Sequence, residues 1–509
     1  MSRSEQQWLA ETRALLLRGD RAAADTALAA ALQEHPHSFE LRRIAAGIHV
    51  QAGRDAAAES LLRELLRERP HDAGAAFTLA GMLVAQARNH AAASVLRACF
   101  DGAAQDAELA IRAIEMLDDA DRKPDAAAIA AQAIVATPAD PRLHAYAGML
   151  ALQLGEFESA RRHYLFALEH APQACEWHVP HGLASAQRYR DSGHPDFALF
   201  RACLQRDDLG GKARSTLLFA LGKAHDDIGE SAQAARYFVQ ANALAHSLTR
   251  WSREDWCRAV EARLAAPPIT ARMQAREDFV PVFIVGMPRS GTTLLAERLA
   301  LHPRVCNRGE LPWMARLAER PDLAGVPDHG ALERAAGIYT ARMRRDDAPH
   351  GARWFIDKQP LNFRFVDLML ALFPQARIVQ CERGPRDTAL SLWMQSFSED
   401  VQGYAYDFGD IAQVMRDCER LMAHWRRRFP EAIRSVRYED LVADPQAAIS
   451  GLGDWLGMPR VETAAGVQSP AGIATASLWQ ARQPVYTRSV GRWRDYLDCI
   501  PELSGFAAG

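Results

Sequence analysis

The sequence predicts two folds in one chain: an α-helical repeat solenoid over residues 1–250 and an α/β domain built on a parallel sheet over residues 279–509. Prolines recur at a regular interval in the first half, and short apolar runs alternate with amphipathic stretches in the second. Between the halves, Pro267-Pro268 and the charged stretch up to Asp278 indicate a linker or domain edge at 251–278. With 49% hydrophobic and 24% charged residues, the 509-residue chain has the composition of an ordinary folded protein of two or three domains.

Charge and cysteine content exclude several classes of protein. Lys+Arg 60 against Asp+Glu 63 gives a net charge of −3, so a general nucleic-acid binder is not expected and any anion site must be local. The eight cysteines form no CxxC pair and no cluster, which indicates neither a disulfide framework nor structural zinc. No apolar stretch is long enough to span a membrane, and the first residues lack the pattern of a signal peptide. We therefore expect a cytoplasmic protein.

The proline spacing of the first half predicts its repeat unit. The position numbers of Pro36, Pro70, Pro138 and Pro172 differ by 34, 68 and 34, and the skipped place falls at Ala104 in a turn-like segment. This period, with two antiparallel helices per unit and a proline closing the second, resembles a tetratricopeptide array, whose units have about 34 residues. Such arrays stack into a superhelix whose concave groove usually binds peptides or protein segments.

Small and aromatic residues support this period. Gly148 is expected where the first helix of a unit packs closely and Tyr164 in the second helix, and Gly222 and Phe238 repeat the scheme. An irregular unit of about 40 residues lies between them, around CEWHVPHGLASAQRYRDSGHPDF. The alternative interpretation is a generic helical bundle.

The second half predicts a parallel sheet. Apolar runs at 280–286, 353–357, 376–382 and 433–440 are each followed by a helix candidate. Strands that alternate with helices form parallel sheets covered on both faces, and ligands bind beyond the carboxyl ends of such strands.

The loop after the first of these runs predicts an anion site. Gly286 and Gly291 have the Gly-x4-Gly spacing of a phosphate-binding loop that leads into a helix N-terminus. A nucleotide-hydrolysing loop requires Lys directly after the second Gly, but Thr292 stands there and the cation is Arg289. This excludes a nucleotide kinase and suits a terminal phosphate without bound Mg²⁺.

The segment PRSGTTLL resembles the 5′-phosphosulfate loop of sulfotransferases that use 3′-phosphoadenosine 5′-phosphosulfate (PAPS) as cosubstrate. Arg in place of the more usual Lys is similar to the tyrosylprotein sulfotransferase branch. The resemblance spans about residues 280–500 and implies that the loop binds the cosubstrate through Arg289, Ser290, Gly291, Thr292 and Thr293.

Later motifs extend the resemblance and imply further roles. Glu310 falls on the position of the catalytic base of that branch, and Lys358 lies in a loop that resembles its lysine-bearing loop. Arg383 and Ser391 have the Arg-x7-Ser spacing of the 3′-phosphate motif. Three more residues are implied in cosubstrate binding: Tyr438 of the YEDL segment, Ser477, and Arg492 of Gly-Arg-Trp.

The residues also support this chemistry on their own. Transfer of a sulfuryl group to a hydroxyl needs a base and cations for the sulfonate and leaving oxygens, for which Glu310, Lys358 and Arg289 are the catalytic candidates. No metal is required, and His178 and His181 have no partner that would complete a metal site. Plainer interpretations are a surface ion pair for Glu310 and a solvated loop lysine for Lys358.

The sequence thus predicts a PAPS-dependent sulfotransferase with a hydroxyl acceptor. The first choice of acceptor is tyrosine in a protein or peptide segment held in the tetratricopeptide groove. Pro312 stands where the tyrosylprotein enzymes have an Arg that helps to hold an acidic peptide. The alternatives are a carbohydrate or small-molecule sulfotransferase, and a non-catalytic interaction protein that binds nucleotide.

Overall fold

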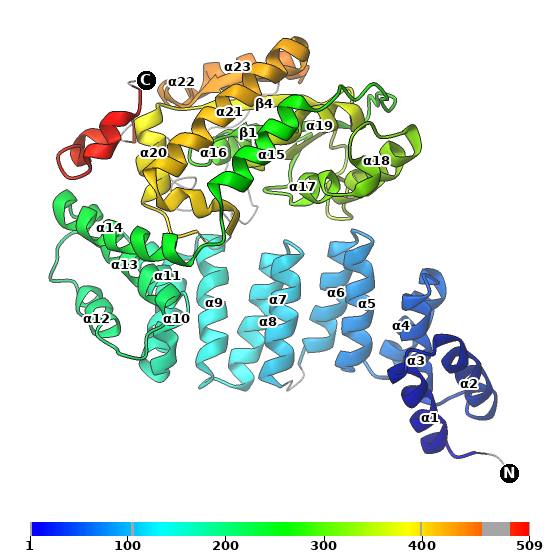
Figure 1. Cartoon of the computed structure of the whole chain (residues 1–509). Coiled ribbons are helices and arrows are strands. Elements are labelled where there is room, and N and C mark those ends of the chain that lie inside the picture. Colours follow the sequence, from blue (N-terminus) through cyan, green and yellow to red (C-terminus); the bar gives the residue numbers. More distant parts are fainter. Residues whose placement is uncertain (1–2, 103–105, 398–399, 461–488, 508–509) are drawn as a thin grey trace. The chain divides into compact units, whose positions relative to one another are not determined.

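The computed structural model describes residues 3–102, 106–397, 400–460 and 489–507 (Figure 1). It divides into two compact units, one of residues 1–147 with 345–347 and the other of residues 148–344 with 348–509. The division falls inside helix α9 (Pro141–Leu154), not at residue 250. The last helical repeats therefore belong to the same unit as the α/β domain.

The first unit consists of antiparallel helix pairs of the predicted period. The helices are α1 (Glu5–Leu17), α2 (Arg21–Glu34), α3 (Phe39–Gln51), α4 (Asp55–Glu68), α5 (Ala73–Ala85), α6 (Asn89–Phe100), α7 (Ala107–Asp119) and α8 (Lys123–Ala136). The first helices of successive pairs, α9 included, begin at positions 5, 39, 73, 107 and 141, a constant step of 34. This confirms the tetratricopeptide solenoid.

The second unit begins with the irregular repeats. Its helices are α10 (Phe157–His170), α11 (Val179–Ser185), α12 (Pro195–Leu204), α13 (Gly211–Asp227) and α14 (Ser231–Leu248). A Cβ atom at Gly148 would lie 2.7 Å from the Tyr164 ring, and one at Gly222 would lie 2.6 Å from the Phe238 ring. The predicted glycine positions are therefore sites where an aromatic ring packs directly on a helix backbone.

One cysteine pair departs from the sequence expectation. Cys175 and Cys203 form a disulfide, with 5.9 Å between their Cα atoms. The two residues are 28 apart and their surroundings carry no pairing motif, so no local pattern predicts the bond. Disulfides are rare in cytoplasmic proteins, so this bond runs against the expected location.

The segment predicted as a linker contains a helix. Helix α15 (Arg253–Ala265) packs on α21 (Phe408–Arg428), where the Trp256 indole donates to Asp417 over 3.1 Å. In the same unit, the Asn242 amide of α14 donates to the carbonyl of Trp393 over 2.9 Å. These buried contacts join the last repeat and α15 to the α/β domain.

The α/β domain contains a five-stranded parallel sheet of order β2-β3-β1-β4-β5. The strands are β1 (Val280–Gly286), β2 (Val305–Asn307), β3 (Trp354–Asp357), β4 (Arg377–Glu382) and β5 (Ile433–Arg437). Four match the predicted runs, although β5 stops at Arg437, where α22 (Tyr438–Ala443) follows. The short edge strand β2 was not predicted.

Helices cover both faces of the sheet, because residues of β1 alternate between two cores. Phe283 and Val285 lie in a large core on one face, whereas Val282 and Ile284 lie in a smaller core on the other. The helices of this domain are α16 (Thr292–Leu299), α17 (Trp313–Ala318), α18 (His329–Met343), α19 (Val366–Leu372), α20 (Pro385–Trp393), α21, α22 and α23 (Pro445–Leu456). Because all five strands are parallel, their carboxyl ends lie at the same edge of the sheet.

No helix in the described part of the chain has the length and apolarity needed to cross a membrane.

Candidate active site

The five strands each lead into a predicted site residue at their carboxyl ends. The loop 286–293 follows β1, Lys358 follows β3 and Arg383 follows β4 directly. Glu310 lies three residues beyond β2, and Tyr438 follows β5. Because the strands are parallel, this topology brings residues that are far apart in the sequence to one edge of the sheet.

The loop after β1 has a backbone that only certain residues allow. Gly286 has φ 136° and Gly291 has φ 97°. A Cβ at Gly286 would lie 2.4 Å from the Cys381 carbonyl oxygen, and one at Gly291 would lie 2.5 Å from the Tyr438 ring. Arg289 adopts φ 71°, which is costly for a residue with a side chain. Such strain persists where the surrounding structure enforces it, often at a functional site.

The loop presents donors to one point. Gly291 is the N-cap of α16, and among the described residues no side chain caps this helix, so its first turn presents backbone amide donors. The Ser290 hydroxyl is buried and has no hydrogen-bond partner among the described residues. Thr292 and Thr293 are also buried. A helix N-terminus beside a buried, unpartnered hydroxyl fits an anion.

Arg289 connects this loop to α20. Its Nε donates to the Ser391 hydroxyl over 3.1 Å, so the two predicted anion-binding motifs are in direct contact. Arg289 is only 8% exposed, so its charge lies inside the site rather than on the surface.

Arg383 is a largely buried cation held by neutral groups. Its guanidinium donates to the carbonyls of Arg289 over 2.8 Å and Ser489 over 2.6 Å, and it lies 4.7 Å from the centre of the Tyr438 ring. In the described ranges no carboxylate pairs with it, and its Nε has no hydrogen-bond partner. Burial lowers the pKa of this guanidinium. A buried charge without a counter-ion is costly, so a bound anion would stabilise this arrangement.

Arg492 lies near this group but pairs elsewhere. The backbone amides of Gly491 and Trp493 donate to the two Asp387 carboxylate oxygens, at 2.6 and 3.0 Å, which fixes the loop against α20. The Arg492 guanidinium forms an ion pair with Asp226 of α13. The predicted contact of Arg492 with the cosubstrate therefore competes with the carboxylate of Asp226, which belongs to the helical repeats. The other residue predicted in this region, Ser477, lies outside the described residues.

Glu310 and Lys358 form an ion pair through Oε1 and Nζ. The Lys358 side chain is 2% exposed and that of Glu310 is 32% exposed, so the carboxylate faces the solvent side of the pair. The Lys358 amide also donates to the Gly309 carbonyl over 2.7 Å. The structure therefore brings together the predicted base and the predicted catalytic lysine, which replaces the interpretation of Lys358 as a solvated lysine.

Asp357 is the first residue of the lysine-bearing loop motif, and the sequence assigns it no role of its own. Its fully buried carboxylate accepts a hydrogen bond from the Leu311 backbone N–H at 3.2 Å and from the Asn362 side-chain amide at 3.1 Å. It also accepts one from the Tyr339 hydroxyl. It thereby fixes the residue that follows Glu310. Burial raises the pKa of Asp357 to about 7. Its place at the end of β3, directly before Lys358, was the only available signal.

A cavity of about 440 Å³ opens at the carboxyl ends of β4 and β5. Ser290 and Arg383 reach it from the two anion motifs, and Gly384, Thr388 and Arg437 also line it. Glu382, Glu419 and Glu439 also line the cavity, so away from Ser290 and Arg383 its wall offers carboxylate acceptors that suit an uncharged group with amino or amide donors.

The site is built for anions and proton transfer. In the described ranges, no three His, Cys, Asp or Glu residues form a group that could hold a metal ion. The arrangement combines a strained Gly-rich loop, a largely buried guanidinium and a carboxylate paired with a lysine. It can bind two anionic groups and accept a proton.

Comparison with known proteins agrees with both halves of the chain. Residues 281–462 match the model of the sulfotransferase family, and residues 15–83 match a tetratricopeptide repeat model. The chain thus joins tetratricopeptide repeats to a domain that matches the sulfotransferase family.

Several curated proteins are similar over part of their length. An uncharacterized protein of Aquifex aeolicus is 28% identical over 309 residues, covering 56% of this chain and 40% of its own. Nodulation protein NoeE of Sinorhizobium fredii is 30% identical over 259 residues, which cover 42% of this chain and 60% of NoeE. Protein-tyrosine sulfotransferase 2 of Gallus gallus is 25% identical over 262 residues, which cover 44% of this chain and 67% of that protein. The chain spans about half the length of the first two relatives.

Two solved structures are similar at low identity. The sulfotransferase domain of the Synechococcus PCC 7002 olefin synthase is 20% identical with a TM-score of 0.33, covering 47% of this chain and 99% of that one. The tetratricopeptide protein TTC0263 of Thermus thermophilus is 24% identical with a TM-score of 0.23, covering 36% and 98%.

Proposed function

We propose that the α/β domain transfers a sulfuryl group from PAPS to a hydroxyl acceptor, with tyrosine in a protein or peptide as the first choice. The observation that carries the proposal is the pair of anion sites at one sheet edge. One is the loop 286–293, and the other is Arg383, which lacks a carboxylate partner in the described ranges. PAPS carries its 5′-phosphosulfate and its 3′-phosphate on two different carbons of one ribose and therefore needs two such sites.

The residues present fit this cosubstrate. The Ser290 hydroxyl, which has no hydrogen-bond partner in the part of the chain that the structure describes, and the N-terminus of α16 would hold the 5′-phosphosulfate. Arg383 and Ser391 would hold the 3′-phosphate. The cavity at the ends of β4 and β5 is lined by Glu382, Glu419 and Glu439, whose carboxylates can accept from an adenine amino group.

The chemistry assigns one task to each catalytic residue. The cosubstrate supplies a sulfuryl group joined to its 5′-phosphate through an activated oxygen bridge. Glu310 takes the proton of the acceptor hydroxyl as that oxygen bonds to sulfur. Lys358 and Arg289 stabilise negative charge on the sulfonate and on the bridging oxygen that leaves with the nucleotide. The ion pair with Lys358 holds Glu310 in place before the acceptor arrives.

Three observations support a peptide acceptor. Relatives of this chain include protein-tyrosine sulfotransferases of Gallus gallus and Drosophila melanogaster. Three residues after Glu310, the Trp313 ring contacts the guanidiniums of Arg316 and Arg342, at 5.0 and 4.3 Å. This basic, aromatic surface suits an acidic segment, and the repeats offer room for an extended chain.

One observation favours the alternative acceptor. Pro312, which is exposed, stands where the tyrosylprotein enzymes have an arginine that holds peptide. A carbohydrate or small-molecule hydroxyl would not need that arginine.

The test is ³⁵S transfer from labelled PAPS by the full chain. A tyrosine peptide library, the same library with Phe for Tyr, and a glycan panel serve as acceptors, and Glu310→Gln is the control variant. We expect label on the tyrosine peptides alone. Label on glycans alone would overturn the acceptor and retain sulfuryl transfer. Nucleotide binding without transfer to any acceptor would favour a non-catalytic interaction protein.

A further inference from the structure

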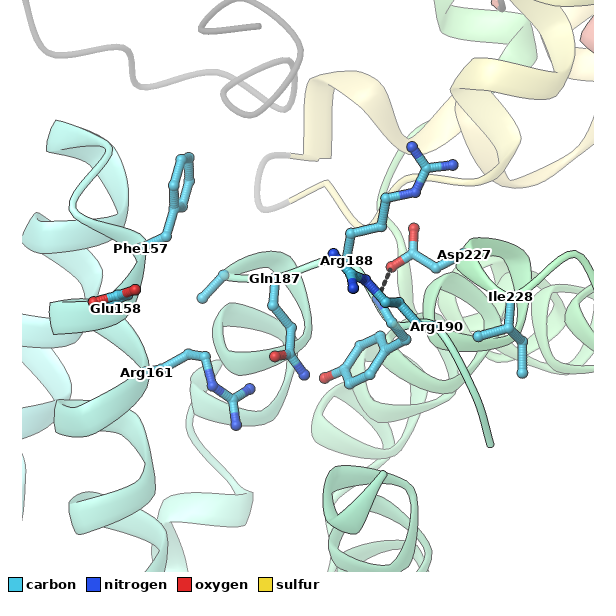
Figure 2. Close-up of a pocket in the computed structure, with 10 residues that line it drawn as sticks. Phe157, Glu158, Arg161, Gln187, Arg188, Arg190, Asp227 and Ile228 are labelled. Atoms are coloured by element: carbon cyan, nitrogen blue, oxygen red, sulfur yellow. Dashed lines mark hydrogen bonds between the residues drawn. The ribbon is translucent and has the colours of Figure 1, made fainter. Parts of the chain in front are cut away.

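A second cavity lies in the irregular repeats of the second unit. Its volume is about 910 Å³ (Figure 2). One wall is the start of α10, with Phe157, Glu158 and Arg161. The other comprises residues 186–190 after α11 and residues 227–228 at the end of α13.

Ion pairs and hydrogen bonds make this cavity rigid. Arg161 pairs with the buried carboxylate of Asp196 over 2.7 Å. Asp196 also accepts from the Tyr189 hydroxyl at 2.7 Å and from the Gln187 side-chain amide at 3.1 Å. At the end of α13, Asp227 accepts from the Tyr189 backbone N–H at 3.1 Å. The wall 186–190 also lies inside the loop that the Cys175–Cys203 disulfide closes.

Two arginines of this wall have no carboxylate partner among the described residues. Arg188 and Arg190 are exposed, and in the described ranges neither guanidinium has an ion-pair or hydrogen-bond partner. The charges of Arg161 and Asp227 are, in contrast, already paired, the latter with Lys223 over 2.5 Å. The two free guanidiniums are therefore the groups that an incoming ligand would meet.

The remaining groups select the class of ligand. Phe157 and Ile228 are half-buried and offer apolar contact. Glu158 is exposed on the wall opposite Gln187 (Figure 2). Its carboxylate would repel a dense polyanion such as a sulfated glycan. A peptide meets both demands, because its carboxylates can pair with the arginines while its amide groups donate to Glu158.

The cavity is also connected to the candidate active site through α13. Asp227 lines the cavity, and its neighbour Asp226 holds the Arg492 guanidinium. Asp226 also accepts from the Tyr496 hydroxyl over 2.5 Å. A segment held in the cavity would therefore lie within the same unit as the predicted cosubstrate site and next to the residue that orients Arg492.

We propose that this cavity binds an acidic, extended segment of the acceptor protein, with its carboxylates on Arg188 and Arg190 and an apolar side chain against Phe157. This inference rests on the proposed function in one respect, namely that the bound segment belongs to an acceptor protein. Binding of the segment does not itself require catalysis.

The experiment measures binding to the full chain by fluorescence anisotropy. The probe is a labelled 12-residue peptide with four Glu residues around a central Phe, and the matched peptide has Gln for Glu. The test variant is Arg188→Ala/Arg190→Ala. The control variant is Arg201→Ala/Arg236→Ala, which removes two exposed arginines outside the cavity.

We expect the Glu peptide to bind, and we expect the Gln peptide and the test variant each to weaken binding at least tenfold. The control variant and Glu310→Gln should bind as wild type does, so a failure of the proposed catalysis leaves this result readable. Equal binding by the test variant and wild type would overturn the proposal. Stronger binding of a sulfated oligosaccharide than of the Glu peptide, lost in the test variant, would also overturn it.

Discussion

Arg383→Met should weaken nucleotide binding strongly while leaving the stability of the unliganded fold nearly unchanged. The wild-type guanidinium is largely buried, has only carbonyl acceptors and no carboxylate in the described ranges, and has a pKa lowered by burial. Met removes the cost of burying that charge but loses two hydrogen bonds, each worth about 1.5–3 kcal/mol. These terms offset each other, so the free energy of unfolding without ligand should stay within about 1 kcal/mol of wild type. Binding of adenosine 3′,5′-bisphosphate should weaken roughly 30- to 1,000-fold, because a buried charge loses its partner.

Urea unfolding and isothermal titration calorimetry measure the two effects separately. Arg434→Met is the matched control, because Arg434 lies on the neighbouring strand β5, is exposed and donates to the Gly451 carbonyl over 3.0 Å, but does not line the cavity. The control should change neither quantity. A strong loss of stability in Arg383→Met with unchanged nucleotide affinity would show that Arg383 supports the fold and binds no phosphate.

Three further predictions concern ligand, cysteines and pH. In a thermal shift assay without Mg²⁺, adenosine 3′,5′-bisphosphate at one hundred times its Kd should stabilise the protein by about 2.7 kcal/mol. The stabilisation should be smaller in Arg289→Ala. Stabilisation by ATP with Mg²⁺ but not by the bisphosphate would contradict this prediction. Thiol titration of the unfolded, unreduced protein should find six free thiols, and eight would show that the disulfide is absent. Cys175→Ser should lower the free energy of unfolding by about 3.5 kcal/mol. The raised pKa of Asp357, about 7, means that the folded state holds its proton more tightly than the unfolded state does. Stability should therefore fall by up to about 4 kcal/mol as pH rises from about 4 to about 7, and Asp357→Asn should remove this loss; parallel curves for variant and wild type would refute it.

The helical repeats and the central strands were predictable because their signals are local. Pro36, Pro70, Pro138 and Pro172 each follow the second helix of a pair by two residues, so their spacing reports the repeat directly. The strands β1, β3 and β4 are buried apolar runs, which the sequence displays as such.

The features that were missed depend on contacts between distant residues. Strand β2 has only three residues and exists through its pairing with β3. Helix α15 is stabilised by the Trp256–Asp417 bond, across 161 residues, so its sequence resembles a linker. The Arg492–Asp226 pair joins residues 266 apart, and no local pattern predicts it.

The candidate site was predictable in its membership but not in its pairing. The Gly286–Gly291 spacing and the motifs around Arg383 and Glu310 identify the residues that follow the strands. The structure adds which of them touch: Arg289 with Ser391, and Lys358 with Glu310. It also adds Asp357, whose buried hydrogen bonds cannot be recognised from sequence.

Comparing wild type with Glu310→Gln, in sulfuryl transfer from PAPS and in bisphosphate affinity, separates catalysis from nucleotide binding at this site. Glu310 is one-third exposed, is paired with Lys358, and follows a different strand from Arg383, which would hold phosphate. We predict that turnover falls by roughly 10²–10⁴ while the Kd for adenosine 3′,5′-bisphosphate changes less than about threefold. Loss of nucleotide binding together with retained turnover would contradict the assignment of Glu310 as the base.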